Sequence, residues 1–428
     1  MIVRLKLLID WRALALSVLV LTTTLFLNQG FVWGKTVEEG EQCQGVHKGH
    51  TVDAETLLTI LQAHKKWLAN RQDPEGAKAN LCGADLREVD FREVDLSGAN
   101  LSGTQMAQAN LSGATLVKTN FQGANLVEAT LSISDLREAN FSFAVLTGAD
   151  LRKTDAERAI FYQAILRDVN FSEAYLVLAD LQEADIQEGY LVGADLEMTN
   201  LRKAHLQGAD LQGATLFRAI LVGTQFNGAD CHDADFQEAD MRKANLDSTG
   251  LRGANFNEAN LEQASLREAN LERAILYKVN LQKADLSEAS LHEADMLLGD
   301  LRGARLRKAE LDEAYMAKAN LREADLEDAD FSWVNMVEAD LTSANLTRAV
   351  LFNTNLQDAN LFEANLHGAD MRGTDIRNTK LTRTVLRGTS LKFVQGLTQE
   401  QLNEACVGGK TGLPEGMTRP QPCRGKKN

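Results

Sequence analysis

A five-residue period runs through most of this chain and constrains its fold more than any other feature. From Leu81 to Leu391, every fifth residue is Leu, Phe, Met or Ile, with Ala156 and Cys231 as the exceptions. The residue two positions earlier is always small or slim, and neither position ever carries a charge. A helix would repeat its apolar face every 3.6 residues and a flat strand every 2 residues. The period therefore predicts a backbone that turns a corner every five residues and buries two of them.

Composition alone would suggest a different architecture. A chain of 428 residues with 44% hydrophobic residues, 31 Gly and 4 Pro is typical of two or three globular domains. The fixed period takes precedence, because each unit of a repeat protein buries its apolar side only against its neighbours. We therefore expect one continuous repeat stack over residues 79–393.

The units resemble those of the pentapeptide-repeat family. The typical unit reads Ala-Asn-Leu-x-x or Ala-Asp-Leu-x-x, as in residues 99–103 and 209–213, and the resemblance covers residues 79–393. It implies an all-β fold, a right-handed quadrilateral parallel β-helix in which four units form one coil, with about sixteen coils and short α-helical caps. Residues twenty apart should then lie over one another, so that Phe121, Phe141 and Phe161 form one internal stack.

Two details of the units carry structural expectations. The Asn or Asp before each central residue is expected to form hydrogen-bond ladders that hold the turns, because these positions recur in every unit and single out no metal site. Ala156 places a methyl group where most units have a Leu-sized side chain. This predicts a void unless Phe161 or Leu136 fills it.

Both flanks of the repeats are predicted to cover the end coils. Residues 35–78 form an N-terminal segment in which residues 53–70 show an amphipathic helical pattern. His64 lies in a stretch that resembles the helix preceding the repeats in many bacterial family members, which implies a packing role. Residues 394–428 form a C-terminal cap and tail. There, Thr398 and Gln401 make a capping box that predicts a short helix ending near Cys406.

The first 34 residues have the pattern of a signal peptide. Three basic residues precede an uncharged apolar run from Ala13 to Leu27, which is short for a membrane span. Cleavage would leave no stable membrane span, and the alternative is an uncleaved signal anchor. The pattern predicts an exported protein, in the periplasm or the thylakoid lumen.

The five cysteines fit export to a compartment that permits disulfides. Cys406 and Cys423 lie together beyond the repeats, Cys43 and Cys82 flank the N-terminal cap, and Cys231 replaces a central Leu. We expect two disulfides and one buried thiol. Spacing alone leaves the pairing open, and five unpaired cysteines in a reducing compartment are the alternative.

Charge and motifs exclude several function classes. The net charge of −15 disfavours nucleic-acid binding. Acidic and basic residues often stand side by side, so the surface is mixed rather than a field of a single sign. No phosphate-binding loop, catalytic triad or metal-ligand cluster is evident, so we expect no catalytic residue, no cofactor and no metal. Some cytoplasmic family members mimic DNA and act on topoisomerases, but an export signal makes that function a weak candidate here.

Two functions remain, and both require a protein partner that the sequence does not identify. The first is an exported scaffold that presents the surface of the solenoid. The second is a regulator of a membrane or envelope transport or stress system, with manganese uptake implied only by resemblance to one exported branch of the family. The sequence does not indicate an oligomeric state.

One face of the predicted solenoid departs from the polar pattern of the outward positions. Four residues spaced by twenty should form an apolar ladder, and three more should lie beside it. Contiguous apolar surface often marks an interface, although Tyr and Leu at turns can also simply cover backbone. The seven candidate residues are Ile275, Tyr277, Leu297, Leu298, Tyr315, Ala317 and Val337.

Overall fold

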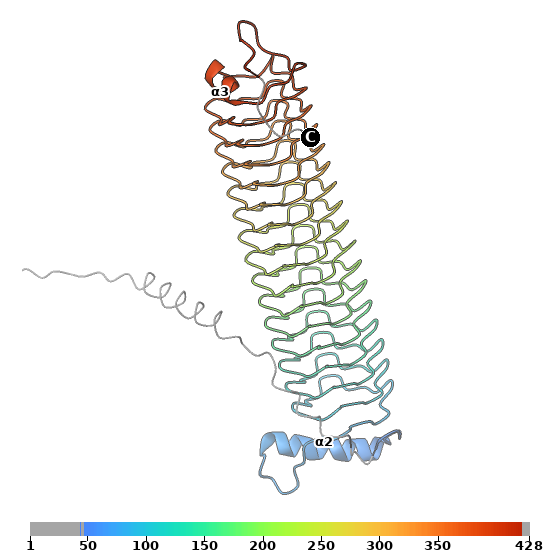
Figure 1. Ribbon diagram of the computed structural model, residues 1–428. Coiled ribbons are helices and arrows are strands. Elements are labelled where there is room, and N and C mark those ends of the chain that lie inside the picture. The colour runs from blue at the N-terminus through green and yellow to red at the C-terminus, as the bar shows by residue number, and fades with distance from the viewer. Residues whose placement is uncertain (1–42, 44–46, 422–428) are drawn as a thin grey trace, which may run out of the picture. The chain divides into compact units, whose positions relative to one another are not determined.

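The computed structural model describes residue 43 and residues 47–421. The chain divides into two units, residues 1–44 and 45–428, and the repeats lie within the second. Two helices border the repeats within that unit, α2 (Ala54–Ala69) and α3 (Gln399–Glu404) (Figure 1). The predicted signal peptide, residues 1–34, lies outside the described residues.

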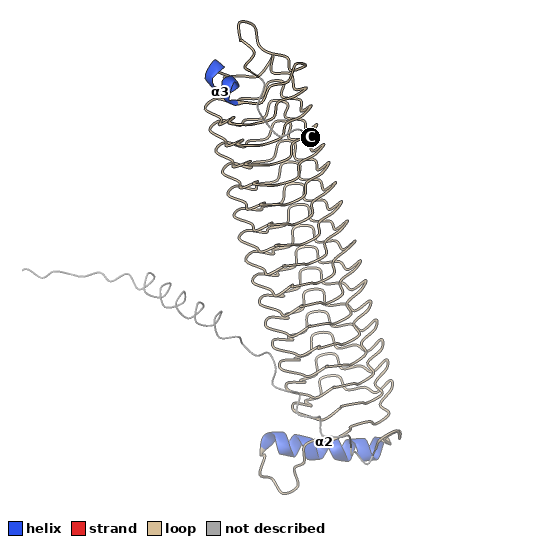
Figure 2. Ribbon diagram, viewed as in Figure 1, coloured by secondary structure: helices blue, strands red, loops and turns tan. Residues whose placement is uncertain are grey.

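The repeats wind into coils whose successive turns pair in parallel. Asn80 bridges to Asn100, Asn100 to Asn120, and this pattern continues through Asp375 and Gln395. Each bridge is isolated, so the described residues contain no named strand and Figure 2 shows turns and loops between the helices. The predicted parallel stacking is therefore present without continuous strands, because each straight segment between corners contributes a single bridging residue.

Each corner is a tight turn closed by one backbone hydrogen bond. The Ala84 amide, for example, donates to the Leu81 carbonyl over 3.0 Å. The third residue of the turn has a positive φ, which is 68° at Gly83 and 58° at Glu88. A positive φ at this position is typical of a type II turn and normally favours Gly. Most units nevertheless place a charged or polar residue there.

The central residues form a continuous buried core, as the five-residue period predicted. The Phe121 and Phe141 rings stack with centroids 4.6 Å apart and an interplanar angle of 3°. Phe161 continues the stack at 4.9 Å and 4°. All three side chains are fully buried. The expected column of residues twenty apart is therefore confirmed.

Both exceptions to the large central residue lie near pairs of Phe rings that meet inside the stack. Phe226 and Phe236 flank Cys231 in sequence, and their rings meet edge to face with centroids 6.1 Å apart. Phe161, the next central residue after Ala156, meets Phe171 edge to face at 5.6 Å. Whether Phe161 or Leu136 fills the space left by the Ala156 methyl group stays a prediction.

The Asn and Asp residues before the central positions hold the turns as expected. Asn100 Oδ1 accepts hydrogen bonds from the Ser102 amide at 3.2 Å and from Ser102 Oγ at 2.8 Å. Asn100 Nδ2 donates to Asn80 Oδ1 in the coil below over 3.2 Å. The same side chain thus fixes the corner that follows it and the register between two coils.

Helix α2 covers the N-terminal end of the core. Asp53 caps it by accepting from the Thr56 amide over 2.9 Å. Leu57 and Leu61 pack against the core from one side of the helix. His64 is buried beneath it and serves the packing role that the sequence implied. The bounds of the helix agree with the predicted pattern over residues 53–70.

Helix α3 covers the opposite end. The predicted capping box is present, since the Gln401 amide donates to Thr398 Oγ1 over 3.2 Å and Gln401 Oε1 accepts from the Thr398 amide over 2.8 Å. Gln401 Nε2 also donates to the carbonyls of Ile376 and Thr379 in the last coils. The helix ends at Glu404, slightly before the expected end near Cys406, because the chain then resumes pairing at Cys406 with Val385.

The cysteines fall into two states. Cys43, Cys82 and Cys406 are each disulfide-bonded. Cys231 is free and fully buried, and burial raises the pKa of its thiol. These states agree with the expected buried thiol and with disulfides at both ends. Cys423 lies outside the described residues.

Candidate interaction surface

The structure places the predicted apolar ladder on consecutive coils. The Lys278 amide donates to the Leu297 carbonyl over 2.9 Å, and the Leu298 amide donates to the Ala317 carbonyl over 3.1 Å. The Lys318 amide continues the series to the Val337 carbonyl over 2.8 Å. These bonds hold Tyr277, Leu297, Ala317 and Val337 at equivalent corners of adjacent coils.

Ile275 and Tyr315 lie on the wall that leads into this corner. Both bridge to Asp295, which separates them by one coil. Ile275 is 41% exposed, Leu298 41% and Tyr315 40%. The most accessible apolar atoms of the candidate surface therefore belong to these three residues rather than to the ladder itself.

The ladder is less exposed than its outward position suggested. Tyr277, Leu297 and Val337 are half-buried, and Ala317 is buried with 6% of its surface exposed. The side chain that directly follows a central residue lies in the corner between adjacent coils, where a methyl group is too short to reach past its neighbours. Ala317 is therefore corrected from a contact residue to a packing residue. We call the other six residues the apolar ladder surface.

Charged side chains border this surface. The Lys278 ammonium lies 5.0 Å from the centroid of the Tyr277 ring and pairs with Glu258 at 3.1 Å. The hydrogen bond that Lys278 donates to Glu258 raises the pKa of Lys278. Lys318 pairs with Glu338 at 3.6 Å on the same corner. An apolar centre with a charged, solvent-exposed rim is the usual composition of a protein interface.

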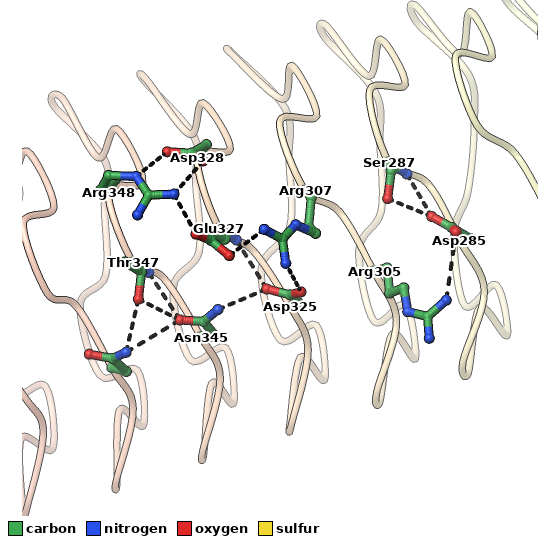
Figure 3. A network of polar contacts seen from close by, with 11 residues as sticks. Asp285, Ser287, Arg305, Arg307, Asp325, Glu327, Asp328, Asn345, Thr347 and Arg348 are labelled. Carbon is green, nitrogen blue, oxygen red and sulfur yellow. Dashed lines mark hydrogen bonds and ion pairs between the residues drawn. The ribbon is translucent and has the colours of Figure 1, made fainter. Parts of the chain in front are cut away.

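Other corners of the stack carry networks of opposite charges. Arg348 pairs with Asp328 at 2.7 Å and also with Glu327 (Figure 3). Arg307 pairs with the same Glu327 at 2.5 Å and with Asp325 at 3.2 Å. These pairs are solvent-exposed and contribute little stability one by one. They occupy carboxylates that could otherwise act in acid–base chemistry.

His292 lies between two carboxylates, one of them from the next coil. Its Nδ1 lies 2.6 Å from Asp312 Oδ2, and its Nε2 lies 3.2 Å from Glu293 Oε1. Burial lowers the pKa of His292, but the hydrogen bond to Asp312 and the nearby carboxylates outweigh it and raise the pKa overall. Both ring nitrogens are occupied, so the arrangement is an ion-pair cluster. The twenty-residue spacing of His292 and Asp312 could have revealed it.

The described residues contain no cluster of His, Cys, Asp and Glu that could hold a metal ion. A pocket at the C-terminal end is lined by Arg387, Val407, Gly408 and Arg419, among others. The Arg419 guanidinium donates to the Gly408 and Thr411 carbonyls, so it holds the cap together. Across residues 47–421, no helix is both long and apolar enough for a bilayer span.

Comparison with known proteins establishes the family. The signature of the Pentapeptide repeats family matches segments between residues 77 and 378 that together cover more than half of the chain. The chain belongs to the pentapeptide-repeat family. Members of this family adopt a right-handed quadrilateral β-helix, and they are typically non-enzymatic proteins of structure or interaction. No catalytic family is indicated for this pentapeptide-repeat protein.

Several solved pentapeptide-repeat proteins are similar to it. HetL, involved in heterocyst differentiation regulation in the cyanobacterium Nostoc sp. strain PCC 7120, is 30% identical over 56% of this chain and 89% of its own, with a TM-score of 0.17. Rfr23 from the cyanobacterium Cyanothece 51142 is 28% identical over 31% of this chain and 63% of its own, with a TM-score of 0.14. A protein of the Arabidopsis thaliana thylakoid lumen is 25% identical over 29% of this chain and 70% of its own, with a TM-score of 0.15. No curated protein matches the sequence.

Proposed function

We propose that this pentapeptide-repeat protein is a non-enzymatic, exported scaffold that binds a protein partner through the apolar ladder surface. The observation that carries the proposal is the clustering of Ile275, Leu298 and Tyr315, each about two-fifths exposed, on neighbouring coils. Half-buried Tyr277 and Leu297 connect them. Exposed apolar side chains that gather in one place indicate a contact surface more strongly than scattered ones do.

The composition of the surface favours a protein as the partner. Tyr residues are frequent anchors of protein interfaces, because a large ring buries much area with few rotatable bonds. Lys278 and Lys318 at the rim are already paired with Glu258 and Glu338, which leaves little free positive charge for a nucleic acid. The partner is expected to present apolar side chains framed by polar ones.

The proposed scaffold is a right-handed stack of about sixteen coils. Export to the periplasm or the thylakoid lumen is part of the proposal, and the bonded states of Cys43, Cys82 and Cys406 support it. Disulfides form and persist in oxidising compartments and are rare in the cytosol.

The test is affinity purification of the exported protein with Tyr277→Ser and Leu297→Ser combined. Ser occurs naturally at this position of the unit, as in Ser102, so the corner should keep its fold. We expect partner recovery to fall by about tenfold or more, the scale of losing an interface anchor. Phe362→Ser is the matched control, since Phe362 is also half-buried at this position but lies on another corner.

Unchanged partner recovery by a folded double variant would reject the surface. Loss of recovery in the Phe362→Ser control as well would indicate a general effect on the scaffold. A transport or stress-response protein of the membrane or envelope, recovered in stoichiometric amount, would favour the regulatory alternative, in which manganese uptake is one candidate by family resemblance. Recovery of a topoisomerase would instead favour DNA mimicry and overturn export.

A further inference from the structure

One corner of the repeat stack carries no charged residue over four consecutive coils. It consists of residues 100–105, 120–125, 140–145 and 160–165, and none of these is Asp, Glu, Lys, Arg or His. Asp85 lies below this surface and Asp180 above it. In a chain with 25% charged residues, this absence over a contiguous surface is unusual. We call these four segments the charge-free corner.

The four segments form one continuous surface. Asn100 bridges to Asn120, Asn120 to Asn140 and Asn140 to Ile160, which stacks the walls on one side of the corner. On its other side Val145 bridges to Ile165. The corner itself is continued by the Phe143 amide, which donates to the Tyr162 carbonyl over 2.9 Å.

Exposed apolar side chains gather at the upper end of the charge-free corner. Phe143 is 44% exposed, Ile160 38% and Ile165 41%. The Phe143 and Tyr162 rings meet edge to face with centroids 5.5 Å apart, so the aromatic pair is preorganised. Gly103 and Gly123 occupy the position of Phe143 in the two preceding coils, so they add no side chain to this corner.

Other parts of the stack differ sharply in charge. On the wall that runs from Asp95 to Asp375, every charged residue is Asp. On the wall that runs from Asp90 to Asp370, every charged residue is Asp or Glu. Several of these Asp are paired with an Arg two residues later, as Asp135 is with Arg137 at 2.5 Å. The net charge of −15 still opposes the close approach of two copies along their charged faces, whereas an uncharged face opposes no like charges.

We propose that the charge-free corner binds a second copy of this chain. In a two-fold contact each surface meets itself, so it must be complementary to itself. Asn and Gln satisfy this condition because an amide both donates and accepts hydrogen bonds, whereas a row of carboxylates only accepts. Asn100, Asn120 and Asn140 already use their Oδ1 atoms to hold the turns. Gln122, two coils before Tyr162 at the same corner, supplies such an amide group.

A second copy fits this surface better than an unrelated partner does. Charged partners are recognised and steered by complementary charge, and this corner offers none. Depletion of charge with retained aromatic residues is the composition found at the centre of protein interfaces. The proposal does not depend on the apolar ladder surface, which lies on later coils.

The test is sedimentation velocity of the purified exported protein over a wide range of concentrations. We expect a concentration-dependent dimer. Phe143→Lys combined with Tyr162→Lys should raise the dimer dissociation constant by about tenfold or more. Other units carry a basic residue at these positions, with Lys203 at the position of Phe143 and Arg202 at the position of Tyr162, so the variant should fold. The control is Trp333→Lys combined with Phe352→Lys, another edge-to-face pair at 5.7 Å on a different corner.

A smaller change tests the charge argument directly. Asn140→Asp keeps the oxygen that accepts from the Ser142 amide at 2.9 Å, so the turn is preserved while one negative charge enters each copy. We expect weaker dimerisation that high salt restores, because salt screens exposed charges. Asn320→Asp, on the same wall outside the charge-free corner, should leave the dimer unchanged.

Three outcomes would overturn the proposal. The first is a wild-type protein that stays monomeric at every concentration. The second is a dimer that survives the Phe143 and Tyr162 substitutions. The third is a monomer that holds a different polypeptide at this corner. Dimerisation that persists in the Tyr277→Ser and Leu297→Ser variant would separate this inference from the proposed partner surface.

Discussion

The Ala79 amide lies 3.1 Å from His64 Nδ1 and donates a hydrogen bond to it. This bond joins helix α2 to the first coil and requires a neutral, unprotonated Nδ1. The ring is buried with 1% of the residue exposed, and its Nε2 has no hydrogen-bond partner. Trp67 stacks on it with centroids 5.4 Å apart. A titratable group therefore sits inside the contact between the cap and the core.

The first prediction is that the N-terminal cap loosens in acid. Burial, the largest effect, and Lys78 lower the pKa of His64, while Asp95 raises it. Because the folded pKa lies below the unfolded value of 6.5, the contribution of His64 to stability is complete above pH 6.5. It is lost as the pH falls through the lowered folded pKa. Hydrogen exchange of the Ala79 amide should speed up in this range.

The control is His64→Asn, whose Oδ1 takes the place of Nδ1 and can accept the same bond but does not titrate. The variant should show a weaker pH dependence of exchange at Ala79 than the wild-type protein. Equal pH dependence in both proteins would mean that another group controls the cap.

The second prediction concerns the left-handed turn position at Ile133. This residue has φ 61° and is 70% exposed, so a β-branched side chain pays conformational strain without burying much surface. Ile133→Gly should raise stability by about 1 kcal/mol, measured as the urea midpoint. Gly113 occupies the equivalent corner one coil below, with φ 67° and room for a Cβ. Gly113→Ile should lower stability by a similar amount, and a shift of both variants in the same direction would contradict the argument.

The third prediction tests why the central position at Cys231 is small. Phe226 and Phe236 already meet beside it, so Cys231→Leu should overpack the interior and cost about 1–3 kcal/mol. Adding Phe226→Leu to this variant should recover most of the loss, because it returns the volume. A double-mutant cycle of thermal unfolding measures the coupling between the two sites. Additive effects would show that the two side chains do not share space.

The fourth prediction concerns thiols. Protein unfolded without reductant should react with one equivalent of thiol reagent per chain, at Cys231, because Cys43, Cys82 and Cys406 are bonded and we predict that Cys423 is the partner of Cys406. Cys406→Ser should destabilise the C-terminal cap by about 3 kcal/mol if a disulfide there closes a loop of fewer than twenty residues. Limited proteolysis of the C-terminal end measures this loss. Five reactive thiols would rule out the disulfides.

The sequence predicted the interior better than the surface. A strict period of five fixes which side chains point inward, so the Phe121, Phe141 and Phe161 stack follows from counting. Exposure does not follow in the same way, because it depends on how far each side chain extends past its neighbours in adjacent coils. Ala317 stands at an outward position of its unit but is buried, whereas Leu298, one position later in its own unit, is exposed.

Long-range pairs escaped the sequence reasoning for a related reason. His292 and Asp312 are twenty residues apart and touch, yet each looks like an isolated polar residue along the chain. The charge-free corner is likewise spread over four separate segments. Such features become visible only when the sequence is written in rows of one coil.

The parallel register of the bridges also governs how this protein can change in length. Asn80 meets Asn100 because four units separate them, so gain or loss of four whole units would leave every later side chain on its original wall. Gain or loss of a single unit would instead rotate all later coils by a quarter turn. When the change falls between residues 165 and 275, the angle between the charge-free corner and the apolar ladder surface changes, although each surface remains intact. Duplication of one unit in this interval would therefore reorient one proposed binding surface relative to the other without altering a single contact residue.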